Sequence, residues 1–467
     1  MSGEKPKVRS KVAVKSNLLP INERIGNFKE VNLGYLKTEE VAEECERCFQ
    51  CFTKSDPNEK PPPCMKYCPT HCNSREVIKN VMDNNIEYAL RIIYEHYPFP
   101  RSVERVCPGY CQLYCTAGKK GDSIQIPLIK RFLVDNYGPY KNFFKCEADI
   151  GKKVAIIGSG PLGLTAAYYL RKLGISVTIF EKTNIVGGMM AFEIPEFRLP
   201  RDILNEEISD LKNLGVEIVL NRAIDEDFTI ESLLESGYDA IIIGIGTHKA
   251  RQTDLPGGNP KVILQGLSFL RNFHMNNQNP NLEGKKVVVI GGGSTATDAA
   301  RVSKRLGAEV SILYRRKKEQ MPAGKGEIQD TEDEGIAISY LIAPVKYVCT
   351  EDKIQGAVCQ KIELGDPDSS GRPTPIPIDA SNFNVEADYI IEAIGQEPDL
   401  DGFNTEKLKI TDMNTFIVNE KFVTSIPDVL AGGDCVTGSK RVVEAVAHGK
   451  IIADQLKSIF SEEKDKS

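Results

Sequence analysis

Two glycine-rich segments constrain the fold of this chain more than any other feature, because each lies between a run of β-branched residues and a helix-forming stretch. They are Gly158-Ser-Gly160-Pro-Leu-Gly163 after Val154–Ile157, and Gly291-Gly-Gly293-Ser294-Thr-Ala296 after Val287–Ile290. Such a turn opens a βαβ unit that binds a dinucleotide, since the bare backbone and the helix N-terminus receive the pyrophosphate. A purely structural turn is the alternative at each place. The pattern predicts two parallel sheets with two nucleotide sites.

The pattern around these turns supports an α/β fold class. From residue 152, short β-branched runs alternate with helix-forming segments, as in proteins with parallel sheets. The predicted strands are Lys153–Ile157, Val177–Glu181, Ala240–Gly244, Val287–Ile290, Val310–Tyr314 and Tyr389–Ala393. Before them, residues 74–97 have helical periodicity on both sides of a polar Asp83-Asn84-Asn85 break. We therefore expect a helical N-terminal part that contains a pair of helices.

The first nucleotide site has an acid where a ribose would lie. The strand Val177–Glu181 ends in Glu181, whose carboxylate can accept both hydroxyls of an adenosine ribose, so the site suits FAD or NAD. Gly187-Gly188 and the later Gly433-Asp434 favour FAD, since the latter is similar to the segment by which flavoproteins with two dinucleotide domains hold the ribityl chain through an aspartate. The alternative for Asp434 is an N-cap of the helix expected over 442–448.

The second nucleotide site differs in charge. Its second strand, Val310–Tyr314, ends in Arg315 and Arg316 instead of an acid. Guanidinium groups bind a 2′-phosphate in a bidentate manner, and no carboxylate is present to repel it. Two arginines at the end of this strand therefore predict that the site binds NADPH. The alternative is that they are a solvated pair on the surface.

Composition limits the classes of partner and the compartment. A net charge of −6 gives no basic footprint for nucleic acid. No window approaches the roughly 18 consecutive apolar residues of a membrane helix, and the basic N-terminus lacks the apolar core of a secretory signal. We therefore expect a cytoplasmic protein without a membrane span, whose thirteen cysteines are reduced or bind metal.

Ten of the thirteen cysteines lie before residue 147. Seven of them form motifs: Cys48-x2-Cys51, Cys64-x3-Cys68-Pro69 and Cys107-Pro108-x2-Cys111-x3-Cys115. The first four alone would also suit a zinc ion. The Cys-Pro pairs and the additional cysteines favour iron–sulfur clusters.

In unbroken order over about residues 40–455, the chain resembles the small chain of NADPH-dependent glutamate synthase, whose module also opens dihydropyrimidine dehydrogenase. The motifs that carry this resemblance, besides the glycine turns, are Arg47-Cys48-x2-Cys51, Cys64-x3-Cys68-Pro69, Pro98-Phe-Pro, Arg105-Val-Cys107-Pro108, Tyr314-Arg-Arg with Met321-Pro-Ala, Ala393-Ile-Gly395-Gln and Ala431-Gly-Gly433-Asp434. The resemblance implies FAD, NADPH and two 4Fe-4S clusters.

The resemblance also implies which cysteines bind which cluster. Cys48, Cys51, Cys64 and Cys115 would hold one, and Cys68, Cys107 and Cys111 the other. Relatives supply the last ligand from a Glu or Gln at the position of Lys130, and a protonated lysine has no lone pair for iron. We assign Cys72 as the fourth ligand of the second cluster. The alternative is that Cys72 is a small buried residue.

These expectations combine into one prediction. Residues 1–150 would form the iron–sulfur domain, 151–285 and 390–467 the FAD domain with the C-terminal tail, and 286–389 an inserted NADPH domain. No side chain is assigned as catalytic: hydride would pass from the nicotinamide to flavin N5, and electrons would leave through the clusters to an external acceptor.

Two alternatives to this prediction stay open. One is a disulfide reductase of the thioredoxin reductase type, which is disfavoured because Cys349 and Cys359 in the expected NADPH domain do not form a Cys-x2-Cys pair. The other is an obligate electron-transfer subunit of a larger complex, without turnover of its own.

Overall fold

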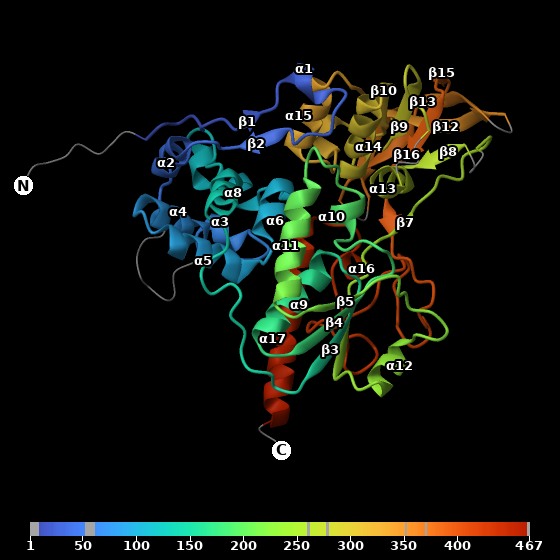
Figure 1. Cartoon of the computed structure of the whole chain (residues 1–467). Coiled ribbons are helices and arrows are strands. Elements are labelled where there is room, and N and C mark those ends of the chain that lie inside the picture. Colours follow the sequence, from blue (N-terminus) through green and yellow to red (C-terminus); the bar gives the residue numbers. More distant parts are fainter. Residues whose placement is uncertain are drawn as a thin grey trace, which may run out of the picture.

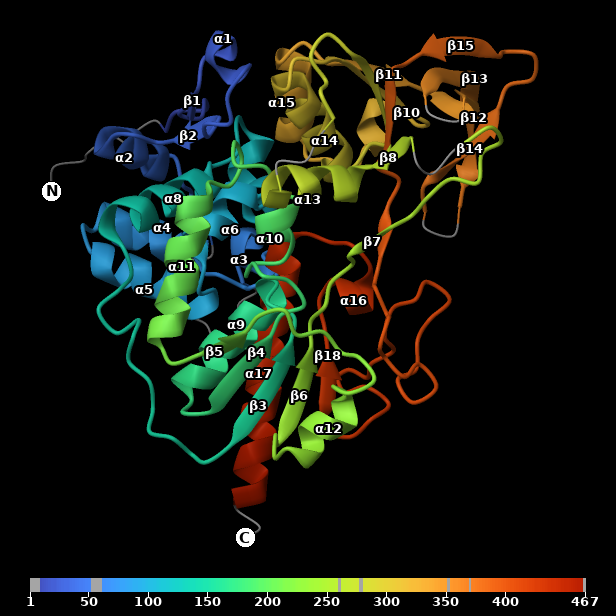
Figure 2. The ribbon, with the colours of Figure 1, turned by 45° about the vertical axis from the view of Figure 1, so that its right-hand side comes forward.

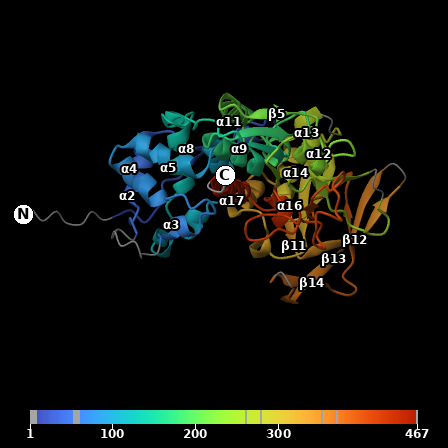
Figure 3. The same cartoon turned by 90° about the horizontal axis from the view of Figure 1, so that it is seen from below.

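The architecture is α/β, as predicted, with a helical N-terminal part beside two parallel sheets (Figure 1). The structure is a computed structural model that describes residues 9–51, 61–258, 262–276, 280–350, 353–368 and 371–464. Viewed from below, the N-terminal helices lie at one end of the molecule and an antiparallel sheet lies at the other (Figure 3).

The first parallel sheet contains the first glycine turn and has five strands in the order β18-β6-β3-β4-β5. Their bounds are Val429–Ala431, Ala240–Ile243, Lys153–Ile157, Ser176–Phe180 and Glu217–Val219. The central strands are continuous apolar runs because helices cover both faces of a parallel sheet; all four residues of β6 are buried. The helices of this part are α9 (Pro161–Lys172), α10 (Met189–Phe192), α11 (Arg201–Asn213), α12 (Ile230–Glu235), α16 (Asp434–Thr437) and α17 (Val442–Lys464).

The second parallel sheet contains the second glycine turn and has the order β11-β10-β9-β16-β8. Its strands are Ala337–Tyr340, Glu309–Tyr314, Lys286–Ile290, Tyr389–Glu392 and Ile263–Gln265, and its helices are α13 (Gly266–Asn276), α14 (Ser294–Arg305) and α15 (Lys325–Asp333), with a short 3-10 turn at Lys318–Gln320. This sheet includes β8, which lies before residue 286. The domain boundaries drawn from the sequence stay a prediction.

Two smaller sheets complete this half of the molecule. β12 (Ile342–Cys349), β13 (Ile354–Pro367), β14 (Pro373–Pro377) and β15 (Phe383–Glu386) form an antiparallel sheet. The strands β7 (Lys249–Ala250) and β17 (Gln396–Glu397) pair where the chain passes between the two parallel sheets (Figure 2).

The N-terminal part contains the predicted pair of helices, since α4 and α5 lie on either side of the Asp83–Asn85 break. Its elements are β1 (Asn17–Leu18), α1 (Ile21–Arg24), β2 (Asn32–Gly34), α2 (Thr38–Glu46), α3 (Pro63–Lys66), α4 (Ser74–Met82), α5 (Ile86–His96), α6 (Pro100–Val106), α7 (Tyr110–Leu113), a 3-10 turn at Thr116–Lys119 and α8 (Ile126–Tyr137). The segment around α1 reaches the second sheet domain, where Arg24 pairs with Asp330 of α15 at 3.4 Å.

A buried carboxylate joins the helical part to the first sheet domain. Glu207 of α11 accepts hydrogen bonds at the N-terminus of α6: from the Arg101 nitrogen at 2.8 Å, and from the nitrogen and hydroxyl of Ser102 at 3.0 and 2.6 Å. The two backbone nitrogens belong to the first turn of α6, which has no internal acceptor for them. Glu207 therefore positions α6, whose other end leads directly into Cys107.

Replacing Glu207 by alanine should destabilise this junction strongly. Hydrogen bonds to charged groups contribute about 1.5–3 kcal/mol, and the loss leaves buried donors unsatisfied, so we expect the unfolding free energy to fall by about 3 kcal/mol in a urea titration. Glu206→Ala is the matched control, because Glu206 is 63% exposed and its pair with Arg101 is screened by solvent. Equal losses in both variants would contradict the role of Glu207.

Candidate functional site

One cavity of about 990 Å³ contacts both glycine turns. Its walls include residues at the carboxyl ends of strands from both parallel sheets, which is where α/β sheets bind ligands. Of the cofactor residues predicted from the sequence, these line it: Gly158, Gly160, Glu181, Gly188, Gly291, Gly293, Ser294, Arg315, Arg316, Gly395, Gly433 and Asp434. Gly163 and Ala296 lie behind the turns, in α9 and α14.

The first turn admits no side chain at two of its glycines. Gly158 has a φ of +102°, and an added Cβ would lie 2.6 Å from the carbonyl oxygen of Gly244. A Cβ on Gly163 would lie 2.1 Å from the carbonyl oxygen of Gly158. The glycines thus let α9 begin directly against β3, with its N-terminus toward the cavity.

Glu181 is held in place before any ribose reaches it. One carboxylate oxygen accepts hydrogen bonds from the nitrogen and hydroxyl of Ser159 at 3.0 and 2.6 Å, and the other accepts from the nitrogen and hydroxyl of Thr183 at 2.9 and 2.8 Å. The two backbone donors fix the carboxylate, whereas the two hydroxyls can rotate. Ribose hydroxyls could therefore replace them as donors.

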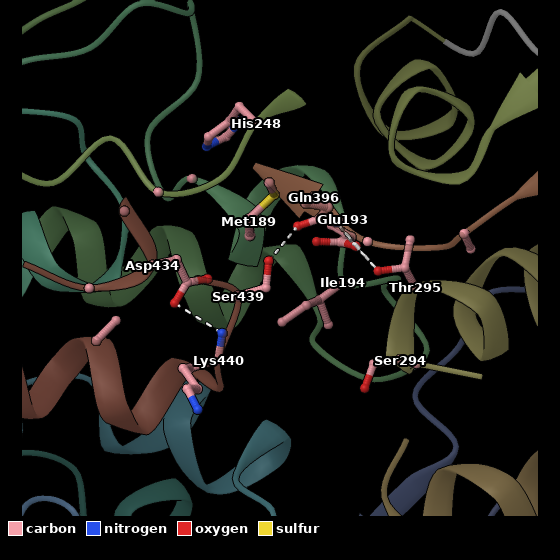
Figure 4. Close-up of a pocket in the computed structure, with 18 of the residues that line it drawn as sticks. Met189, Glu193, Ile194, His248, Ser294, Thr295, Gln396, Asp434, Ser439 and Lys440 are labelled. Atoms are coloured by element: carbon pink, nitrogen blue, oxygen red, sulfur yellow. Dashed lines mark hydrogen bonds between the residues drawn. The ribbon is translucent and has the colours of Figure 1, made fainter. Parts of the chain in front are cut away.

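Asp434 also lines the cavity, at the start of α16. Its carboxylate accepts a hydrogen bond from the Lys440 nitrogen at 3.2 Å (Figure 4), and burial raises its pKa to about 7. Because α17 begins at Val442 and its first turn is closed by Glu444, which accepts from the Arg441 nitrogen at 2.9 Å, Asp434 does not cap that helix. Its side chain is available to a ligand.

The second turn faces a cluster of arginines. Arg315 is exposed, and the pKa of its guanidinium is lowered by burial of part of the group and by the neighbouring charges of Arg316 and Arg372. Arg316 is buried and donates to the Pro373 carbonyl at 2.7 Å and to Asp368 at 3.2 Å. Arg372, which lines the same cavity, was missed by the sequence analysis because it comes from the distant turn before β14.

Three polar residues meet between the two turns and were also missed. Glu193, directly after α10, accepts a hydrogen bond from Gln396 of β17 at 2.8 Å and another from Thr295 of α14 (Figure 4). Burial raises the pKa of Glu193. Each residue comes from a different segment, so no local pattern could have brought them together.

Four of the predicted cysteine ligands gather beside α3. Burial raises the pKa of Cys64 to about 12, and the neighbouring thiols act in the same direction; these neighbours are Cys48, Cys115 and Cys51. The Cys51 sulfur lies 2.7 Å from the Thr116 hydroxyl. This set is the one that the family resemblance implies for the first cluster.

A second group of predicted ligands includes Cys107, whose neighbours in sequence reach the cavity wall. Burial raises the pKa of Cys111 well above its usual value, with Cys107 and Cys68 among the charges around it. Val106 and Tyr110 flank Cys107 in sequence, and both line the nucleotide cavity. Among the described residues, no three His, Cys, Asp or Glu side chains are placed to share a single metal ion.

The remaining cysteines do not form a dithiol site. All thirteen are free thiols. Cys349 and Cys359 are not opposite each other in the antiparallel sheet, because Cys349 pairs with Ile354 and Cys359 with Pro344. Neither lines the cavity, so the geometry lacks the thiol pair that a thioredoxin reductase mechanism needs.

In the part of the chain that the structure describes, no helix is long and apolar enough to cross a membrane.

Two family models match the chain, one in its N-terminal part and one in the remainder. Residues 152–449 match the family described as pyridine nucleotide-disulphide oxidoreductase, and residues 24–141 match the one described as dihydropyrimidine dehydrogenase domain II, 4Fe-4S cluster. FprA from Mycobacterium tuberculosis, solved with NADPH, has a similar fold, with a TM-score of 0.56 and 19% identity over 67% of this chain and 86% of that one.

Curated relatives cover nearly the whole chain. The small chain of NADPH glutamate synthase from Escherichia coli is 30% identical over 93% of this chain and 94% of its own length. The beta subunit of an NADP(+)-dependent formate dehydrogenase from Moorella thermoacetica is 38% identical over 83% of this chain, which spans only 58% of that protein. The beta subunit of an NADPH-Fe(3+) oxidoreductase from Geobacter sulfurreducens is 32% identical over 93% of this chain and 67% of its own length. The chain therefore belongs to the pyridine nucleotide-disulphide oxidoreductase family, as an NADPH-dependent flavoprotein with an iron–sulfur domain related to glutamate synthase small chains.

Proposed function

We propose that the two ends of the cavity bind FAD and NADPH through the residues that the sequence indicated. FAD would lie on the first turn, where Glu181 would bind its ribose and Asp434 its ribityl chain. The cofactor would also contact the backbone at four glycines, Gly160, Gly188, Gly395 and Gly433. NADPH would lie on Gly291, Gly293 and Ser294, with its 2′-phosphate on Arg315. The observation that supports this proposal is that one cavity contacts both turns.

The arginines would share the 2′-phosphate unequally. Arg316 already donates to Pro373 and Asp368, so part of its guanidinium is engaged. Arg315 is exposed, and the guanidinium of Arg372 donates a hydrogen bond to the Tyr314 hydroxyl at 3.2 Å. We propose that Arg315 and Arg372 make the main phosphate contacts, with Arg316 supporting them.

The cysteine groups would form a path for electrons away from the cavity. We propose that Cys68, Cys107 and Cys111 bind the cluster nearer the flavin, and that Cys48, Cys51, Cys64 and Cys115 bind the other. Bound FAD accepts a hydride from NADPH and releases single electrons to iron–sulfur clusters. The placement of Val106 and Tyr110 in the cavity wall, on either side of Cys107, supports this order.

Two cysteine variants test the order. Cys64→Ser should disrupt the outer cluster alone, so NADPH still reduces the flavin and the inner cluster, while reduction of an external acceptor such as ferricyanide slows. Cys111→Ser should disrupt the inner cluster and leave the outer cluster oxidised after NADPH is added anaerobically. Electron paramagnetic resonance distinguishes the two variants. An outer cluster that is still reduced at the normal rate in Cys111→Ser would refute the order.

A second candidate function is that of an electron-transfer subunit, which passes its electrons to a partner chain. Relatives named as beta subunits work in larger assemblies, and this chain spans 58% and 67% of two of them. The chain would then be an electron-transfer subunit in the cytoplasm, dependent on a partner chain. A partner recovered in constant proportion from the native source, with no turnover by the isolated chain, would favour this candidate over the independent oxidoreductase.

A further inference from the structure

A buried carboxylate beside the inner cysteine group has one oxygen without a partner. Glu104 of α6 is 5% exposed, and its Oε1 accepts hydrogen bonds from Lys130, at 2.6 Å, and from the Tyr97 hydroxyl. Its Oε2 is buried and has no hydrogen-bond partner. Because an unsatisfied buried carboxylate oxygen is costly, such an atom in a functional region points to a missing ligand.

The surroundings of Glu104 indicate what that ligand is. Glu104 is an electrostatic neighbour of both Cys107 and Cys111, so its carboxylate lies close to two of the proposed ligands. It lies three residues before Cys107, which directly follows the last residue of α6. The carboxylate thus belongs to the inner cysteine group, which has three thiols for four iron atoms.

Lys130 holds this carboxylate in place. Its ammonium is buried, pairs with Glu104 Oε1 and donates a hydrogen bond to the Tyr97 hydroxyl at 2.9 Å. Lys130 and Glu104 thus form a buried ion pair, whose side chains are 4% and 1% exposed. Because Lys130 engages only Oε1, it leaves Oε2 available on the other side of the carboxylate.

We propose that Glu104 Oε2 is the fourth ligand of the inner cluster and that Lys130 is its positioning residue. The proposal rests on the proposed role of Cys68, Cys107 and Cys111 as the other three ligands. In the family pattern, a carboxylate or amide at the place of Lys130 supplies this oxygen. Here the oxygen comes from α6, and a lysine compensates its charge. Carboxylate oxygen is a common ligand of iron, whereas a protonated lysine is not.

Cys72, the ligand assigned from the sequence, is the competing donor. It is fully buried and stands four residues after Cys68 in the chain. A ligand role for Cys72 would leave Glu104 Oε2 without any partner. The geometry therefore favours the carboxylate.

The test compares variants of the full chain after anaerobic reconstitution, with FAD content as the measure of folding. Wild type should hold about eight irons. Glu104→Asp, which keeps the charge but retracts the oxygen, and Glu104→Ala/Lys130→Met, which removes both charges, should each give a three-iron paramagnetic signal and lose about one iron. Glu104→Ala/Lys130→Glu, which restores the oxygen at the family position, should recover the full iron content. Cys72→Ser should resemble wild type.

The outcomes separate the two proposals. If Glu104→Asp and Glu104→Ala/Lys130→Met both keep wild-type iron and spectra, Glu104 is not the ligand. A three-iron signal in Cys72→Ser would assign Cys72 instead. If the wild-type chain itself binds only about four irons with FAD present, the inner cluster and the proposed function fail before the ligand is at issue.

Discussion

Replacing Arg315 and Arg372 together by alanine is expected to raise the KM for NADPH roughly 100-fold while the KM for NADH changes little. Each charge-assisted phosphate contact contributes about 1.5–3 kcal/mol, and about 1.4 kcal/mol corresponds to a factor of ten. The lower end applies here because Arg315 is exposed and solvent screens its charge. Steady-state kinetics with ferricyanide and both nucleotides measure the ratio.

Lys317→Ala is the matched control for this result. Lys317 is exposed, stands next to Arg316 in the chain and does not line the cavity, so its loss removes one nearby charge without a phosphate contact. An equal rise of KM for NADPH and NADH in the arginine variant would show that these residues do not recognise the 2′-phosphate.

Replacing Gly163 by alanine is expected to remove FAD from the purified protein. The new Cβ would lie 2.1 Å from the Gly158 carbonyl oxygen, so either α9 or the turn must shift. Overpacking of this kind costs roughly 1–3 kcal/mol, and the displaced turn no longer fits a pyrophosphate. We expect flavin absorbance to fall below about a tenth of wild type.

Gly326→Ala serves as the control for that variant. An added Cβ at Gly326 of α15 meets nothing within 4 Å, so this protein should keep its flavin. Normal flavin content in Gly163→Ala would mean that the first turn does not hold the cofactor as proposed.

Local sequence patterns predicted the strands, the glycine turns and the charged residues of both nucleotide sites. The strands before the two turns are β3 and β9, Glu181 directly follows β4, and Arg315 directly follows β10. These features depend on residues close in sequence, whose spacing fixes the strand, turn and helix. These features could therefore be predicted without the structure.

The residues that the sequence did not predict are those brought together by tertiary packing. Arg372 reaches the nucleotide cavity through the antiparallel sheet, far along the chain from Arg315. The pair of Glu104 and Lys130 joins α6 to α8, and neither residue alone suggests a metal site. The division of the cysteines into two groups also came from the family resemblance, since spacing alone allowed a zinc site.

The order of reduction in one anaerobic experiment tests the central claim most directly. NADPH is mixed rapidly with the oxidised protein, flavin absorbance is followed, and samples frozen at intervals are examined by electron paramagnetic resonance. The account predicts that the flavin is reduced first, that the cluster signals follow, and that the flavin-free Gly163→Ala protein shows no cluster reduction. Clusters that stay oxidised beside a fully reduced flavin, or that are reduced by NADPH without flavin, would contradict it.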